Sequence, residues 1–96
     1  AAEEVAAYRI VLEAFTNSVR HAKASACQIL IKIENQTLLL NVSDNGNGLP
    51  KGNRAGVGFT SMRERAEELG GECFIENNPA GGVTVRARLP LGKELN

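Results

Sequence analysis

Three polar side chains within the stretch "EAFTNSVRH" recur every four residues: Glu13, Asn17 and His21. This spacing lines them up along one side of a helix, with Arg20 beside them. The amide oxygen of Asn17 is a neutral, hard ligand suited to Mg²⁺, which usually takes one or two protein ligands and leaves the rest to phosphates and water. Glu13, one turn earlier, is able to orient or deprotonate a nucleophile. A solvated helix face with a histidine near the negative end of the helix dipole explains the same pattern, so both interpretations stay open at this point.

A glycine-rich loop supplies a second candidate group. The segment "DNGNGLPKGNRAGVG", residues 44–58, contains five glycines and follows a predicted strand. Asp44 can accept a hydrogen bond from an exocyclic amine such as adenine offers, while Gly46 and Gly48 allow the backbone to approach a ligand closely. "GVG" at residues 56–58 lies just before a predicted helix, whose free N–H groups form an anion site. Ordinary turn chemistry also explains these glycines, and neither a Rossmann fingerprint nor a Walker A pattern is present.

The first group must be positioned by a helix, predicted from about residue 3 to residue 22. Its large apolar side chains fall at helical spacing and are expected to face the core: Tyr8, Val11, Leu12, Phe15 and Val19. Two alternating segments, 27–34 and 37–43, follow as strands, and the short Asn-Gln between them predicts a hairpin turn. The second strand leads directly into the glycine-rich loop.

The second half of the chain predicts one helix and two more strands. The helix spans residues 60–71, with Thr60 or Ser61 as its N-cap and Gly70-Gly71 as its end. Its expected core-facing residues are Met62, Ala66 and Leu69. Strands at 72–77 and 83–90 complete the order helix, strand, strand, loop, helix, strand, strand. Tight hairpins at both ends favour an α+β two-layer sandwich, with a mixed but mostly antiparallel sheet and helices on one face.

Length and charge limit the function classes. At 96 residues and 43% hydrophobic content, residues 1–96 are expected to form a single domain with one modest core. Lys plus Arg equals Asp plus Glu at 11 each, so no global field recruits nucleic acid or an anionic membrane. Cys27 and Cys73 form no CxxC pair, which argues against a zinc site. We expect a cytoplasmic protein without direct membrane insertion, and a helical start without a capping signal predicts a fragment of a longer chain.

Four segments resemble, in order and spacing, the N, G1, G2 and final-strand boxes of the ATP-binding domains of histidine kinases. They are "EAFTNSVRHA", "DNGNGLP", "GVGFTSMRERAEELGG" and "GGVTVRARLP". The wider GHKL superfamily includes gyrase-type ATPases, and the closest resemblance is to NarX- and DesK-like sensor kinases. The resemblance covers about residues 8–90. It implies the Bergerat ATP-binding fold, with ATP and Mg²⁺ as cofactors.

In this family, the helix that carries the N box contacts the metal and the phosphates. The resemblance implies that Asn17 is the Mg²⁺ ligand and that Arg20 and His21 lie near the phosphates. Glu13 occupies the place of the general base of gyrase-like relatives. In histidine kinases the base can come instead from the helix that carries the phosphoacceptor, so the identity of the base stays open.

The loop and the last strand would form the adenine pocket and the lid. The resemblance implies that Asp44 reads adenine and that Gly46 and Gly48 shape its pocket. Residues 50–55 would be an ATP lid, and the residues expected to close over the phosphates are Gly56, Val57 and Gly58. This lid would close when nucleotide binds.

The last strand departs from the family pattern. Many members begin it with Gly-Thr, whose hydroxyl helps to hold the adenine edge, whereas here Val83 follows Gly82 and the threonine comes next. Strand alternation puts Val83 on one face with Val85, Ala87 and Leu89. Thr84, the candidate adenine contact, should therefore point the other way unless a bulge shifts the register.

The resemblance predicts a domain that transfers the ATP γ-phosphoryl group to a histidine on a separate dimerisation domain, with a response regulator downstream. His21 is the single histidine and lies in the N box, so the phosphoacceptor helix is expected to be absent. The fragment should be a monomer and its parent a homodimer, and the parent could carry a membrane anchor. An anti-sigma-factor-type serine kinase and a degenerate, non-catalytic nucleotide-binding regulatory module are the alternatives. A purely structural adaptor gives no reason for Asn17 or for the glycine-rich loop.

Overall fold

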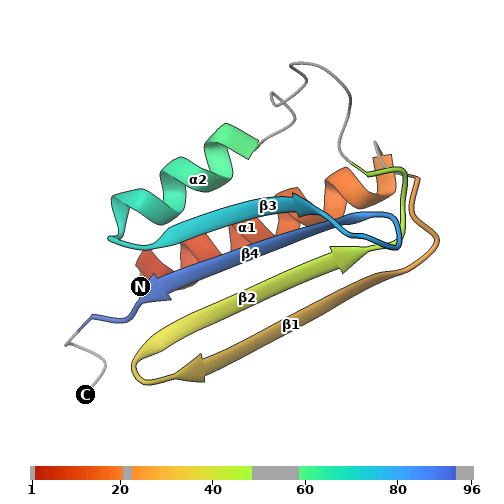
Figure 1. The fold of residues 1–96 in the computed structure, drawn as a ribbon. Helices are drawn as coiled ribbons and strands as arrows, with labels where there is room; N and C mark the ends of the chain where they lie inside the picture. The colour runs from red at the N-terminus through yellow and green to blue at the C-terminus, as the bar shows by residue number, and fades with distance from the viewer. Residues whose placement is uncertain (1, 21–22, 49–58, 93–96) are drawn as a thin grey trace.

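The protein folds as two helices packed on one face of a four-stranded sheet (Figure 1). A computed structural model describes residues 2–20, 23–48 and 59–92. In chain order its elements are α1 (Ala2–Arg20), β1 (Cys27–Glu34), β2 (Thr37–Asp44), α2 (Phe59–Glu68), β3 (Glu72–Asn77) and β4 (Val83–Pro90). The strands lie in the order β1-β2-β4-β3, and each of these three pairings is antiparallel. The predicted α+β two-layer architecture is confirmed. Neither of these helices is long and apolar enough to cross a membrane.

A tight hairpin joins β1 to β2, as the sequence predicts. Asn35 and Gln36 are its two loop residues, and their φ angles of 53° and 59° are both in the left-handed region. Two successive residues of this kind form a type I′ turn, whose twist matches that of the paired strands. Glu34 and Thr37 are therefore directly opposed, and this pairing sets the register of the whole hairpin.

The end of α2 is also as predicted, but its beginning is not. Gly70 has a φ of 78° and donates its N–H to the carbonyl of Glu67, while the N–H of Gly71 bonds to the carbonyl of Ala66 at 2.8 Å. This pair of bonds is a Schellman motif, which satisfies the last carbonyls of the helix. The predicted N-cap is wrong, because α2 begins at Phe59 and places Thr60 and Ser61 inside its first turn.

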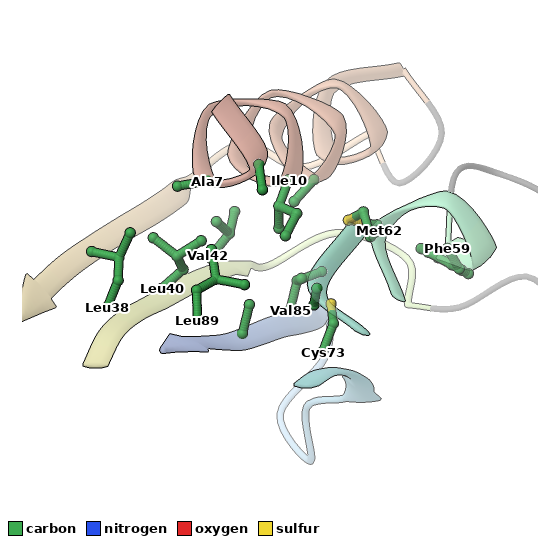
Figure 2. Packing of buried hydrophobic residues seen from close by; sticks show 14 of the residues in the cluster. Ala7, Ile10, Leu38, Leu40, Val42, Phe59, Met62, Cys73, Val85 and Leu89 are labelled. Carbon is green, nitrogen blue, oxygen red and sulfur yellow. The ribbon is translucent and has the colours of Figure 1, made fainter. Parts of the chain in front are cut away.

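The core lies between the helices and the two central strands. Figure 2 shows Ile10 of α1 and Met62 of α2 pointing toward the sheet, above Val42 and Val85. Ile10, Met62 and Leu89 are almost completely buried, at 0%, 1% and 0% exposure. Met62 and Ala66 were predicted to face the core and are buried, and Leu69 packs against the cluster from its edge.

The buried face of α1 differs from the predicted one. The expected stripe of Tyr8, Leu12, Phe15 and Val19 is 43–67% exposed, and only Val11 of that set packs against the core. The residues that α1 buries are instead Ala6, Ala7, Ile10, Ala14 and Ser18. Both sets recur at helical spacing. Small side chains let the helix lie close to β2 and β4, and a row of bulky residues would not fit in that space.

Candidate functional site

Asp44, the last residue of β2, has hydrogen bonds to both of its carboxylate oxygens. Oδ1 accepts the backbone N–H of Gly46 at 2.8 Å and that of Val83 at 3.1 Å. Oδ2 accepts the hydroxyl of Ser18 at 2.7 Å. The three donors come from the glycine-rich loop, from the start of β4 and from α1. One carboxylate therefore joins three segments that are far apart in the sequence, and they hold its orientation.

Close backbone packing at Gly82 makes this arrangement possible. Gly82 is buried with a φ of 98°, and a Cβ built on it would lie 1.9 Å from the carbonyl oxygen of Asp44. No side chain fits there unless β4 moves away from the end of β2. The bond from the Val83 N–H to Asp44 depends on this contact, because Val83 is the next residue along the chain.

Asn45, next to Asp44, bonds to the segment that leads from α1 into β1. Its Oδ1 accepts the N–H groups of Ser25 and Ala26, both at 3.0 Å, and its Nδ2 donates to the Ser25 hydroxyl at 2.9 Å. The Asn45 N–H donates to the carbonyl of Ala26. Asn45 therefore holds the approach to β1 in place.

Thr84 lies on the opposite face of β4 from Val83. Its hydroxyl donates to Asn78 Oδ1 at 2.5 Å and lies 3.0 Å from the Ser43 hydroxyl. Asn78 also donates through Nδ2 to the backbone carbonyl of Asp44 at 3.1 Å. The alternation predicted for this strand is confirmed, since the buried residues are Val83, Val85, Ala87 and Leu89. The contact between Thr84 and adenine stays a prediction. In this structure the Thr84 hydroxyl bonds to the side chains of Asn78 and Ser43 instead.

The polar line predicted on α1 lies on the same helix as Ser18. Glu13 and Asn17 are half-buried, and Arg20 is exposed. Asn17 directly precedes Ser18, whose hydroxyl reaches Asp44. Figure 1 shows the C-terminal end of α1, the end of β2 and the turn between β3 and β4 at the same end of the molecule.

The loop residues of the predicted site are described only in part. Gly46 and Gly48 are half-buried; Gly46 donates its N–H to Asp44, and a Cβ built on Gly48 would lie 2.9 Å from Asn77 Oδ1. The other predicted phosphate-side residues lie outside the described residues: His21, Gly56, Val57, Gly58 and the lid at 50–55.

The comparisons with known proteins agree with this geometry. Residues 2–93 match the model of a family described as "Histidine kinase-, DNA gyrase B-, and HSP90-like ATPase". The chain belongs to this ATPase family. Sensor histidine kinase LiaS of Bacillus subtilis (strain 168) is 36% identical to it over 89 residues, which are 91% of this chain and 25% of LiaS. Sensor protein VraS of Staphylococcus saprophyticus is 35% identical over 89 residues, or 91% of this chain and 26% of VraS.

A solved structure shares the fold of this ATPase domain. The ATP binding domain of PrrB from Mycobacterium tuberculosis matches it with a TM-score of 0.74 and 27% identity, over 93% of this chain and 69% of that one. The predicted relation to sensor histidine kinases is confirmed. The chain spans about a quarter of the length of the curated relatives it matches.

The oxygen atoms that α1 offers suit a cation that also takes ligands from phosphates. In the portions of the ATPase domain that the structure describes, no three or more His, Cys, Asp or Glu side chains gather into a possible metal site. Glu13 and Asn17 lie one turn apart on α1 and offer a carboxylate and an amide oxygen. Mg²⁺ needs no more than one or two such ligands when phosphates and water complete its shell, so the amide oxygen of Asn17, the predicted ligand, fits it.

Sequence reasoning missed the role of Ser18. The residue adjoins the predicted polar line, yet its 2% exposure puts it on the core face of α1. The only signal was a lone hydroxyl four residues after Ala14, in a series of small residues at helical spacing. That signal became informative once Asp44 was found opposite it.

Proposed function

We propose that this chain binds Mg-ATP and supplies the catalytic domain of a sensor histidine kinase. The parent protein would transfer the γ-phosphoryl group of ATP to a histidine on a separate dimerisation domain. The observation that carries this proposal is the carboxylate of Asp44, which α1, the glycine-rich loop and β4 hold together in a chain of this ATPase family.

The hydrogen bonds of Asp44 support selection of adenine. A carboxylate offers about four lone-pair positions, and the donors from Gly46, Val83 and Ser18 occupy three of them. As far as residues 2–20, 23–48 and 59–92 are concerned, one position is left for a donor from a ligand. The 6-amino group of adenine supplies such a donor, whereas guanine carries a carbonyl oxygen at that position and would be repelled by the carboxylate.

The end of α1 is the proposed phosphate side of the site. Asn17 would be the protein ligand of Mg²⁺, which when bound neutralises charge on the phosphates. Arg20, and His21 after it, would add positive charge or hydrogen-bond donors near the same oxygens. Glu13 would orient an incoming acceptor, and a base on the phosphoacceptor helix remains the alternative. Residues 50–58 would cover the nucleotide and exclude water. Catalysis would then rest on positioning and on charge neutralisation.

The proposal extends to the parent protein. The relatives that match at 35–36% identity are named as a sensor histidine kinase and a sensor protein, and this chain corresponds to about a quarter of each. The similarity to these sensor proteins fits a homodimeric parent of the NarX- and DesK-like type. Its catalytic domain would lie in the cytoplasm, and a response regulator would be its downstream partner. The relatives also favour a histidine kinase over a serine kinase.

The proposal is tested by calorimetric titration with a non-hydrolysable ATP analogue, with and without Mg²⁺. GTP is the control for the choice of base. Asp44→Asn should weaken binding of the analogue about tenfold or more. Asn17→Asp should weaken it mainly in the presence of Mg²⁺, because a new negative charge meets the phosphates. Glu34→Gln and Gln28→Glu make the same charge changes at exposed positions of β1 and should bind as the wild type does.

Two results of this titration would count against the proposal. Unchanged affinity in both site variants would remove Asp44 and Asn17 from the nucleotide site. Binding that prefers adenine but ignores Mg²⁺ would instead indicate a nucleotide-binding regulatory module without turnover.

A further inference from the structure

Ser18 is a polar residue in a position where α1 otherwise buries apolar side chains. It is 2% exposed and is among the most completely buried side chains of the described residues. Ala14, one turn earlier, is also buried on this face of the helix. Alanine would fill this place with better helix propensity and without a polar atom. The hydroxyl is therefore of interest for what it bonds to.

The Ser18 hydroxyl lies between three partners. Its Oγ is 2.7 Å from Asp44 Oδ2 and 3.1 Å from the carbonyl oxygen of Ala14, and the thiol of Cys27 donates to it at 3.7 Å. A hydroxyl has one hydrogen to donate. The shorter contact to a charged acceptor is the stronger one, so the hydrogen goes to Asp44. The Cys27 thiol agrees with this direction, because it supplies a donor to the Ser18 oxygen.

The other oxygen of Asp44 has a different kind of support. Oδ1 is bonded to two backbone N–H groups, those of Gly46 and Val83. Backbone donors are present whatever the side chains are. Within the part of the chain that the structure describes, Oδ2 has a remaining acceptor position, and Ser18 is the side chain that bonds to it and directs it.

We propose that Ser18 is a positioning residue for base recognition. It holds Asp44 Oδ2 so that the remaining acceptor position of the carboxylate meets the exocyclic amine of the purine. The inference rests on the proposed function, because it takes Asp44 as the group that reads the base. Ser18 does not contact the ligand and acts through Asp44. Without its hydroxyl, water would compete for Oδ2 and the carboxylate would have greater freedom to rotate.

The test compares two nucleotides that differ at one group. The affinity of a non-hydrolysable ATP analogue is measured beside that of the same analogue built on purine riboside, which lacks the 6-amino group. Ser18→Ala should weaken binding of the adenine analogue about tenfold and leave the purine riboside analogue unchanged. Ser18→Cys keeps a weak donor of similar size and should give an intermediate ratio. Cys27→Ala removes a donor to the Ser18 oxygen but leaves the hydrogen bond from Ser18 to Asp44 in place, so it should keep the wild-type ratio.

A double-mutant cycle with Asp44→Asn completes the test. If Ser18 acts through Asp44, adding Ser18→Ala to the Asp44→Asn variant should change the ratio of the two affinities less than twofold. A Ser18→Ala protein that lowers both affinities equally, or keeps the wild-type ratio, overturns the inference. In that case a loss of adenine preference in Asp44→Asn alone leaves the proposed function standing. A wild-type chain that does not distinguish the two nucleotides overturns the assignment of Asp44 as well.

Discussion

The strands β1 and β2 present equally apolar side chains to the same face of the sheet, yet only those of β2 are buried. Cross-strand partners on this face are 2–8% exposed in β2 and 43–67% exposed in β1. The partners are Ile29 with Val42, Ile31 with Leu40, and Ile33 with Leu38. In Figure 1, β2 lies in the interior of the sheet, next to β4, whereas β1 is the edge strand. Alternation thus identifies an apolar face, but a helix must cover that face before it stabilises the fold.

α1 shows the same contrast around its own axis. One side buries small residues such as Ala7 and Ala14 against the sheet. Tyr8 and Phe15, which have more apolar surface to bury, are 67% and 43% exposed. The size of a side chain therefore does not decide which face is covered. The space between helix and sheet decides it, and small residues fit there.

The largest difference between the two strands should appear on truncation of matched residues. Leu40→Ala should lower the free energy of unfolding by about 2–5 kcal/mol, because Leu40 is 3% exposed and a cavity would remain. Ile31→Ala, at the directly opposed position, should cost less than about 1 kcal/mol because Ile31 is 54% exposed. Urea unfolding of both variants measures the two losses. Equal losses would mean that β1 is covered in solution.

The two cysteines extend the comparison between the edge strand β1 and the covered part of the sheet, because they should differ in reactivity. Cys73, on β3 beneath α2, is buried, and this burial raises the pKa of its thiol from 9.0 to about 11, partly opposed by the charge of Arg63. Cys27, at the start of β1, is half-buried. At pH 8 the thiolate fraction of Cys73 should be about 100-fold below that of an ordinary cysteine. Alkylation followed by peptide mass spectrometry should therefore modify Cys27 first.

The same shift gives a pH dependence with a defined sign. The folded state holds the Cys73 proton more tightly than the unfolded chain does. The resulting stability is fully present below about pH 9 and is lost as the pH rises toward 11. Rapid labelling of Cys73 under native conditions, or unfolding that is independent of pH in this range, would show that β3 is not covered as described.

A smaller effect is expected at the turn between the compared strands. Gln36 adopts a φ of 59°, which is costly for a side chain with a Cβ. Gln36→Gly should relieve this cost and raise the free energy of unfolding by up to about 1 kcal/mol, after allowance for the greater freedom of glycine in the unfolded chain. Asn35→Gly should gain less, because asparagine tolerates this conformation better. A lower melting temperature for Gln36→Gly would contradict the I′ geometry.

The sequence was most informative where structure is local. The Asn35-Gln36 hairpin, the end of α2 at Gly70 and the order of the elements all followed from neighbouring residues, because turns and caps are determined within a few positions. The residue types of the candidate site could be predicted for the same reason. Asp44 after a strand, and Glu13 and Asn17 one turn apart, are patterns of residue type and spacing.

The errors came from packing between segments. α2 begins at Phe59, one residue before the predicted cap, and the side chain of Phe59 is buried in the core. α1 offers two apolar faces at helical spacing, and periodicity could not show which one β2 and β4 would cover. Ser18 was overlooked because its importance depends on Asp44, which is 26 residues later in the chain and 2.7 Å away in the structure.

By itself, the sequence determined the secondary structure, the α+β class and the residue types of the candidate site, because helical and strand periodicities and turn residues act over a few positions. Only the tertiary structure decided that α1 lies on its alanines, that β1 leaves its isoleucines exposed, and that Ser18 and Val83 both bond to Asp44. These outcomes depend on the space between layers and on contacts between distant segments, and no local pattern specifies either.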